Sequence, residues 1–134
     1  MRAALVAVGL LFAVEALACG YCVEDKIAAT YDHAVVIRAL EHGQHIAFFH
    51  VEGPEPRPPA TRRALEGAAS MPGVEKASVR ISVDMRTLSL AFDPRQVSLA
   101  QVMARVDRKL AARKVSLMPL RVMERAADLQ TVRR

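Results

Sequence analysis

Aromatic residues are scarce in this sequence of 134 residues, which has no tryptophan, two tyrosines and four phenylalanines. Proteins that bind single-stranded nucleic acid stack bases on aromatic side chains and gather basic residues on one face. The net charge is +5, but the basic residues are scattered along the chain. We therefore expect no nucleic-acid partner, and we interpret the positive charge as a solvated surface.

Catalytic arrangements are also missing from the sequence. It contains no Ser/His/Asp arrangement, no pair of carboxylates in a shaped context and no phosphate-binding loop. Hydrolytic and transfer chemistry are therefore not expected. We expect that the protein is not an enzyme, with thiol–disulfide chemistry as the one enzymatic alternative.

The N-terminal apolar run is too short to cross a membrane. It extends over twelve residues from Ala3 to Val14 and ends at Glu15, whereas a membrane-spanning helix needs about 20 residues. Small residues at Ala16 and Ala18 follow, which predicts a signal peptide cleaved after residue 18. We expect an exported, periplasmic protein with no stable membrane span after cleavage. Lipidation of Cys19 is the alternative, although Ala16 stands where a lipobox carries leucine.

Both cysteines of the chain lie in one motif, Cys19-Gly20-Tyr21-Cys22. Two thiols three residues apart at a helix start can point to one cation, and soft thiolates select Cu(I) or Zn(II) over hard ions. Cleavage before Cys19 would add its α-amine as a third donor. A structural disulfide and a redox pair remain open for the same residues. The motif also resembles the active-site tetrapeptide of periplasmic disulfide isomerases, but no buried strand precedes it here.

The four histidines are not expected to complete a site with the cysteines. Along a continuous helix with a rise of 1.5 Å per residue, His33 lies about 16 Å and His42 about 30 Å from Cys22. His45 and His50 have opposite parity in a predicted strand, so they do not form a pair on one face. We expect three methionines to fill the core: Met71, Met103 and Met118.

Hydrophobic periodicity predicts an alternation of helices and strands. In order, it indicates a helix over 23–42, a strand over 45–52, a helix over 61–70, hairpin strands over 74–83 and 88–92, a helix over 98–113 and a strand over 115–122. In the first strand, Ile46 and Phe48 face away from Ala47 and Phe49, so both faces need cover, and we expect the first helix to cover Ile46 and Phe48. Pro119 predicts that the last strand lies at a sheet edge.

The order strand, helix, strand, strand, helix, strand indicates an α+β fold, a ferredoxin-like βαββαβ domain with an extra N-terminal helix. The predicted organisation is a signal peptide over 1–18, an N-terminal Cys-x-x-Cys helix segment over 19–43, the ferredoxin-like domain over 44–123 and a polar tail over 124–134.

Three short segments resemble the heavy-metal-associated domains of copper chaperones and copper-pump termini. They are Phe49-His50-Val51-Glu52-Gly53, Met71-Pro72-Gly73-Val74 and Phe92-Asp93-Pro94. That family binds metal through Met-x-Cys-x-x-Cys directly after its first strand. In register, Pro56 and Pro59 occupy the two cysteine positions here, so the ligands of the family's usual site are absent.

The resemblance and the displaced cysteine pair together indicate an exported soft-metal binding or transfer protein that uses Cys19 and Cys22. Copper is the expected ion and zinc is an alternative. A protein that donates or accepts the metal is the expected partner. The other hypotheses are a non-metal interaction module on the same fold and a thiol–disulfide redox protein.

Overall fold

The structure is a computed structural model, and it describes residues 16–54 and 58–131, with side chains over 23–54 and 59–130. Most of the predicted signal peptide, residues 1–15, lies outside the described part of the chain. The helices are α1 (Ala16–Thr30), α2 (His33–Glu41), α3 (Pro58–Ala69) and α4 (Leu99–Leu110), and the strands are β1 (His45–Glu52), β2 (Val74–Ser82), β3 (Thr87–Phe92) and β4 (Ser116–Met123). Short 3₁₀ helices follow α4 as η1 (Ala111–Arg113) and β4 as η2 (Ala126–Thr131). Among these helices, none has the length and apolar character needed to cross a bilayer.

The four strands form one antiparallel sheet in the order β2-β3-β1-β4. The chain runs through β1, α3, β2, β3, α4 and β4 in succession. The fold is therefore α+β, and the arrangement is compatible with a ferredoxin-like fold. The prediction that Pro119 marks an edge strand is confirmed, because β4 pairs only with β1.

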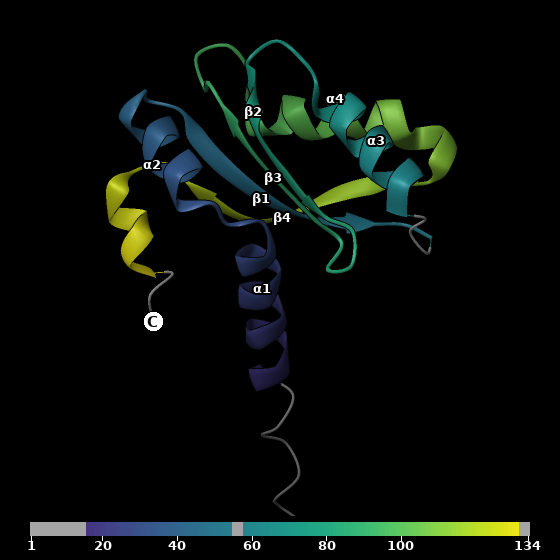
Figure 1. Cartoon of the computed structure of the whole chain (residues 1–134), viewed down its shortest axis with the longest axis horizontal. Helices are drawn as coiled ribbons and strands as arrows, with labels where there is room; N and C mark the ends of the chain where they lie inside the picture. The colour runs from purple at the N-terminus through teal and green to yellow at the C-terminus, as the bar shows by residue number, and fades with distance from the viewer. Residues whose placement is uncertain (1–15, 55–57, 132–134) are drawn as a thin grey trace, which may run out of the picture.

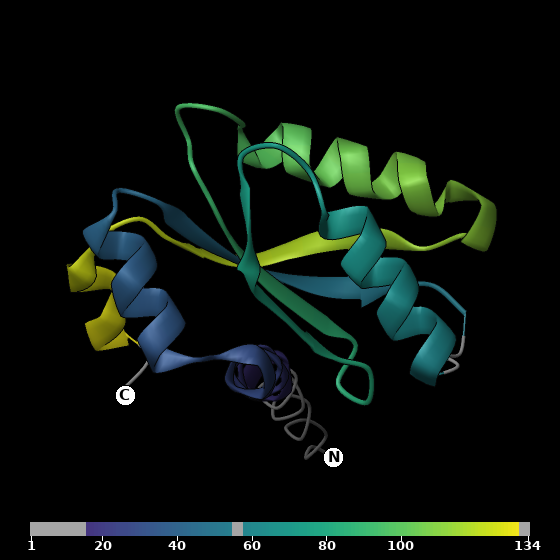
Figure 2. The ribbon, with the colours of Figure 1, turned by 45° about the horizontal axis from the view of Figure 1, so that its top comes forward.

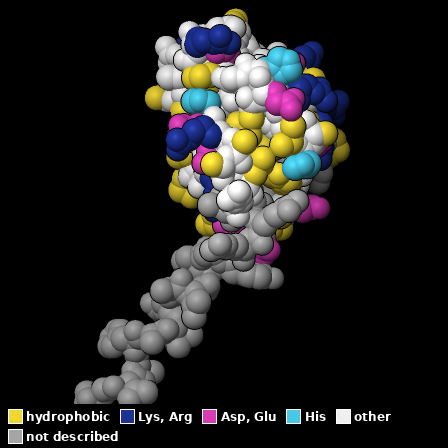
Figure 3. All heavy atoms as spheres, turned by 90° about the vertical axis from the view of Figure 1, so that its left-hand side faces the viewer, with side chains coloured by type: hydrophobic (Ala, Val, Ile, Leu, Met, Phe, Trp, Pro, Cys, Tyr) yellow, Lys and Arg dark blue, Asp and Glu magenta, His cyan; other side chains and the backbone are white. Residues whose placement is uncertain are grey.

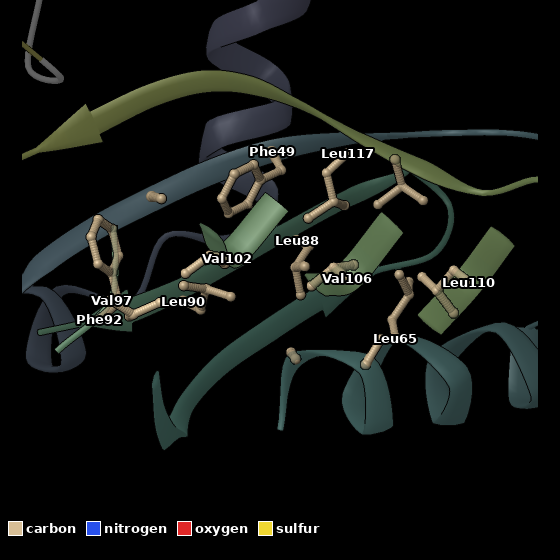
Figure 4. Close-up of a cluster of buried hydrophobic side chains, with 14 residues drawn as sticks. Phe49, Leu65, Leu88, Leu90, Phe92, Val97, Val102, Val106, Leu110 and Leu117 are labelled. Carbon is tan, nitrogen blue, oxygen red and sulfur yellow. The ribbon is translucent and has the colours of Figure 1, made fainter. Parts of the chain in front are cut away.

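Both faces of the sheet carry a hydrophobic core, as the alternation in β1 predicts. Phe49 belongs to the larger cluster on the side of α3 and α4, which Figure 4 shows in close-up. Phe48 and Ile46 belong to a second cluster on the side of α1 and α2, together with Ile27 and Val36 from those helices. Figure 2 shows the two helix pairs on opposite sides of the sheet. The predicted cover of Ile46 and Phe48 by the N-terminal helical region is confirmed.

The single helix predicted over 23–42 is instead two helices. α1 ends at Thr30, and α2 begins after Asp32, whose side-chain oxygen accepts a hydrogen bond from the N–H of Val35 at 3.2 Å. An aspartate oxygen satisfies a free N–H of a new first turn, so it starts a helix more readily than it continues one. Arg80 of β2 donates two further bonds to the same carboxylate, from Nε at 3.2 Å and from Nη2 at 3.0 Å. The break therefore directs α2 along the sheet while α1 stands away from it (Figure 1).

The edge strand β2 pairs irregularly with its neighbour β3. Its pairing with β3 shifts between Glu75 and Arg80. Within this bulge, the hydroxyl oxygen of Ser78 accepts the backbone N–H of Ala91 at 2.7 Å in place of a backbone carbonyl. Nη1 of Arg80 donates to the carbonyl oxygens of Ala77 at 2.9 Å and Val79 at 3.0 Å. An arginine side chain therefore covers carbonyls of an edge strand.

Two loops hold the start of α4 in place. Gly73 adopts a φ of +90°, and its carbonyl accepts the N–H of Asp93 at 2.8 Å. The carboxylate of Asp93 accepts bonds from Arg95 and Gln96, which lowers its pKa to about 2. Ser98 and Gln101 form the predicted capping box.

The C-terminal region differs from its prediction at Met118. Within the predicted polar tail, residues 126–131 form η2, and Leu129 packs against the cluster of Ile46 and Phe48. Met118 is 42% exposed, so the prediction that it fills the core is wrong. On the side that α2 and η2 form, basic side chains lie among acidic and hydrophobic ones, in agreement with their scatter along the sequence (Figure 3).

Candidate functional site

The two cysteines of the predicted metal site lie in the N-terminal half of α1. The backbone at Cys19 and Cys22 is helical, and their side chains lie outside what the structure describes. In Figure 1 this half of α1 points away from the sheet, and the other half leads to it. Side chains three residues apart in a helix are neighbours, with about 5–6 Å between their Cβ atoms. The structure therefore places the two positions one turn apart on a projecting helix.

The base of α1 is attached to three strands. Ile27 is 1% exposed within the second cluster. Glu24 forms an ion pair with Arg121 of β4. The carbonyl of Thr30 accepts the hydroxyl of Ser89 of β3 at 3.0 Å. Together with the contact between Lys26 and His50 of β1, these interactions fix the direction in which α1 leaves the sheet.

Lys26 contacts His50 of β1, with 2.8 Å between Nζ and Nδ1. The carbonyl of Arg86, which accepts the N–H of Val51 at 2.8 Å, also lies 3.1 Å from Nδ1 and can accept a hydrogen bond from it only when Nδ1 carries a proton. An ammonium has only protons to offer, so Nδ1 accepts from Lys26 when the imidazole is neutral. Burial, and then the charge of Lys26, lower the pKa of His50 below its ordinary value of 6.5.

Of the other histidines, His33 and His42 interact with residues close to them in sequence, and His45 interacts with a residue of the neighbouring strand β3. Nδ1 of His33 lies 3.0 Å from the hydroxyl of Tyr31, and Nδ1 of His42 lies 2.6 Å from the carbonyl of Arg38. The ring of His45 meets Phe92 edge-on at 5.6 Å between centroids. Within residues 16–54 and 58–131, no three His, Cys, Asp or Glu side chains come together in a way that could hold a metal ion. The expectation that histidines do not share a site with Cys22 stays a prediction.

The loop between β1 and α3 corresponds to the metal-binding loop of the heavy-metal-associated domains that the sequence resembles. Pro56 lies outside the described residues, and Pro59 lies in the first turn of α3. Proline has neither a side-chain donor atom nor a backbone N–H. Position 59 therefore provides no side-chain metal ligand, as the sequence indicates.

A cleft of about 560 Å³ lies at the same end of the sheet, and sequence reasoning missed it. It is formed by the end of β1, the first turns of α3, the hairpin between β2 and β3, and the region after α4. Among the residues that the structure describes, its charged lining residues are Arg86, Arg113 and Glu52. These residues come from separate segments with no common motif, so only the folded chain reveals the cleft.

Comparison with known proteins identifies no relative: no family model, no curated protein and no solved structure matches the chain.

Proposed function

We propose that this protein is an exported soft-metal binding or transfer protein that holds Cu(I), or alternatively Zn(II), through Cys19 and Cys22. The observation that carries the proposal is the position of both cysteines, one turn apart on the half of α1 that projects from the body. A cation bound there is accessible to a second protein, as transfer requires. In this proposal the body is a ferredoxin-like βαββαβ domain, and the protein is not an enzyme.

Processing of the signal peptide would change the chemistry of the helix start. α1 begins at Ala16, so both cysteines are preceded by helical residues in the unprocessed chain. Cleavage after Ala18 would leave Cys19 as the first residue and Cys22 in the first turn. The N–H groups of a first turn have no acceptor within the helix and favour a thiolate over a thiol. The new α-amine of Cys19 would add a nitrogen donor.

The anchored base of α1 supports a role in transfer. Ile27, Lys26 and Glu24 fasten the helix to the sheet within two turns of Cys22. In this proposal the donors lie on the helix whose following turns are anchored to the sheet. A fixed direction lets a partner protein approach the metal without first ordering the segment that carries it, which lowers the entropic cost of the encounter.

Competition for Cu(I) with a chromophoric chelator tests the proposal on the reduced chain that begins at Cys19. We expect tight binding of one ion and its loss in the Cys19→Ser/Cys22→Ser double variant, whose fold should be unchanged by circular dichroism. The matched control is His45→Ala, which leaves both thiols in place and should change the affinity less than threefold. Equal affinities for the wild type and the double serine variant would exclude the cysteines as the site.

The two other hypotheses give different results in the same experiment. An interaction module without metal would show no binding by the reduced wild type. A redox protein would catalyse reduction of insulin disulfides at a rate that the double serine variant loses. We expect no such catalysis.

The mass of the exported protein tests the processing step. We expect a chain that starts at Cys19 with a free α-amine. A diacylglyceryl adduct on Cys19 would instead show a lipoprotein and would remove the thiolate of that residue from the proposed site.

A further inference from the structure

Two buried hydroxyl groups without partners lie where α1 meets the sheet. Within the described residues, Oγ1 of Thr30 in α1 and Oγ1 of Thr87 in β3 have no hydrogen-bond partner, although the two residues are only 5% and 1% exposed. The carbonyl of Thr30 accepts the hydroxyl of Ser89, which lies two residues from Thr87 on the same face of β3. A buried hydroxyl that has no partner destabilises the packed state. Separation of α1 from the sheet would return both hydroxyls to water.

The same interface holds a titratable group, the imidazole of His50. Thr87 lies directly opposite His50 in the register of β3 and β1, so the two side chains share the face of the sheet that α1 covers. Lys26 of α1 contacts the ring at 2.8 Å. The attachment of α1 therefore includes one contact whose sign depends on a proton.

Charged groups act on His50 from three elements. They are Lys26 of α1, Arg86 of the hairpin between β2 and β3, and Glu52 of β1, while β4 places the uncharged Met118 opposite the ring. Lys26 leaves the ring when α1 leaves the sheet, whereas the other groups stay on the sheet. A positive charge on His50 is less unfavourable without the ammonium beside it. Protonation of the imidazole therefore favours the state in which α1 has separated.

The chain after α1 is held on the sheet independently of α1. Tyr31 stacks on Phe48 of β1 with 6.4 Å between ring centroids. The carboxylate of Asp32 accepts hydrogen bonds from Arg80 of β2 and caps α2. Figure 1 shows α2 turned along the sheet and α1 directed away from it. A movement of α1 can therefore stop at the end of that helix, with α2 unchanged.

The apolar attachment of α1 is small. Among residues 23–30, Ile27 is the one buried hydrophobic residue, and Val23 is partly buried against the second cluster. Burial of one isoleucine side chain stabilises a fold by an amount comparable to the cost of two unpartnered hydroxyls. The ion pair of Glu24 with Arg121 is exposed and adds little. A helix of 15 residues is marginal in water without packing, so a separated α1 also loses its helical hydrogen bonds.

From these contacts we infer that protonation of His50 releases α1 from the sheet as a unit, while the sheet and the helices α2, α3 and α4 stay folded. The helix keeps its direction at neutral pH and loses it in acid. The contacts that carry this inference do not involve Cys19 or Cys22, so it is independent of the proposed metal binding.

Amide hydrogen exchange of the full chain at about pH 7.5 and pH 5, corrected for the intrinsic effect of pH on exchange, tests this inference. We expect the protection of amides 26–30 to be about fivefold lower at the acidic pH, because the separated helix loses its internal hydrogen bonds. The amides of β1 and β3 should keep their protection.

His50→Gln removes the titrating group and keeps a polar side chain. In this variant the protection of amides 26–30 should change less than twofold between the two pH values. The matched control is His42→Gln, which changes an exposed histidine at the end of α2 and should behave as the wild type does. Unchanged protection of α1 in the acidified wild type, an equal loss in His50→Gln, or an equal loss in β1 and β3 would overturn the inference.

A second variant, Thr87→Val, tests the role of the unpartnered hydroxyls. Valine has nearly the shape of threonine and lacks the hydroxyl, so the packed interface should gain stability. We expect the protection of amides 26–30 to rise about threefold at both pH values. Lower protection in Thr87→Val would show that this hydroxyl is bonded in the folded protein, and it would overturn the inference.

Discussion

Lys26 of α1 contacts His50 of β1, with 2.8 Å between Nζ and Nδ1. The contact is favourable while the imidazole is neutral, with its proton on Nε2, because a protonated ring would place two positive charges together. One of the contacts that hold α1 against the sheet therefore depends on the protonation state of His50.

Acidification should weaken this fold through His50. The pKa of His50 in the folded chain lies below its ordinary value of 6.5. At a pH between the folded-state pKa and 6.5, the unfolded chain therefore binds more protons than the folded chain. The contribution is complete above about pH 6.5 and falls as the pH drops toward the folded pKa. Urea unfolding at about pH 7.5 and pH 5 should show a larger loss of stability in the wild type than in His50→Gln. His42→Gln, which changes an exposed histidine at the end of α2, should behave as the wild type does. An identical loss in His50→Gln would contradict the assignment.

Replacement of Gly73 by alanine should destabilise the fold by roughly 2 kcal/mol or more, because it combines left-handed strain with overpacking. The residue has a φ of +90°, and an added Cβ would lie 2.7 Å from Cγ1 of Val97. Gly67 of α3 is the matched control: its added Cβ meets nothing within 4 Å, and alanine there should stabilise the helix by about 0.5–1 kcal/mol. Denaturant midpoints of the two variants should move in opposite directions. A neutral Gly73→Ala would mean that the loop before β2 can shift.

Asp32 should stabilise the fold mainly as the N-cap of α2. Loss of a cap costs about 1 kcal/mol, whereas an ion pair with partners as exposed as Asp32 and Arg80 contributes less. We therefore expect Asp32→Ala to cost about 1–2 kcal/mol and Asp32→Asn, which keeps a capping oxygen, to cost less than half of that. The N–H of Val35 and then Arg80 lower the pKa of Asp32 below 3.8. Its charged form therefore stabilises the fold above that pH and ceases to do so as the pH falls through the folded value. Equal losses in the two variants would show that the charge, and not the cap, carries the effect.

The sequence predicted those elements whose pattern is local. The parity of Ile46 and Phe48 against Phe49 revealed a sheet with two covered faces, and Ser98 with Gln101 revealed the start of α4. The break before α2 also had a local signal, because Asp32 is a residue type that caps helices and its side chain accepts the N–H of Val35, three residues later. The helical spacing of apolar residues continues on both sides of Asp32, so the sequence predicted one continuous helix.

Features that depend on distant segments could not be predicted in the same way. The contact of Lys26 with His50 joins residues 24 positions apart, and neither residue belongs to a motif that pairs them. The cleft assembles Arg86 and Arg113 from two turns that meet only after the sheet has formed. The cysteine pair is a different case: its spacing is local, but the predicted helix begins only at residue 23, whereas α1 includes both Cys19 and Cys22.

The guanidinium of Arg80 also determines how this protein meets copies of itself. The carbonyls of Ala77 and Val79 are acceptors that a strand from another molecule would use to extend the sheet, and Arg80 occupies them within the same chain. At the opposite edge, Pro119 contributes a peptide unit with no proton to donate. Both borders of the sheet are thus poor templates for fibril growth. The side chain that pairs with Asp32 beside the start of α2 thus also limits the addition of a further strand at this border.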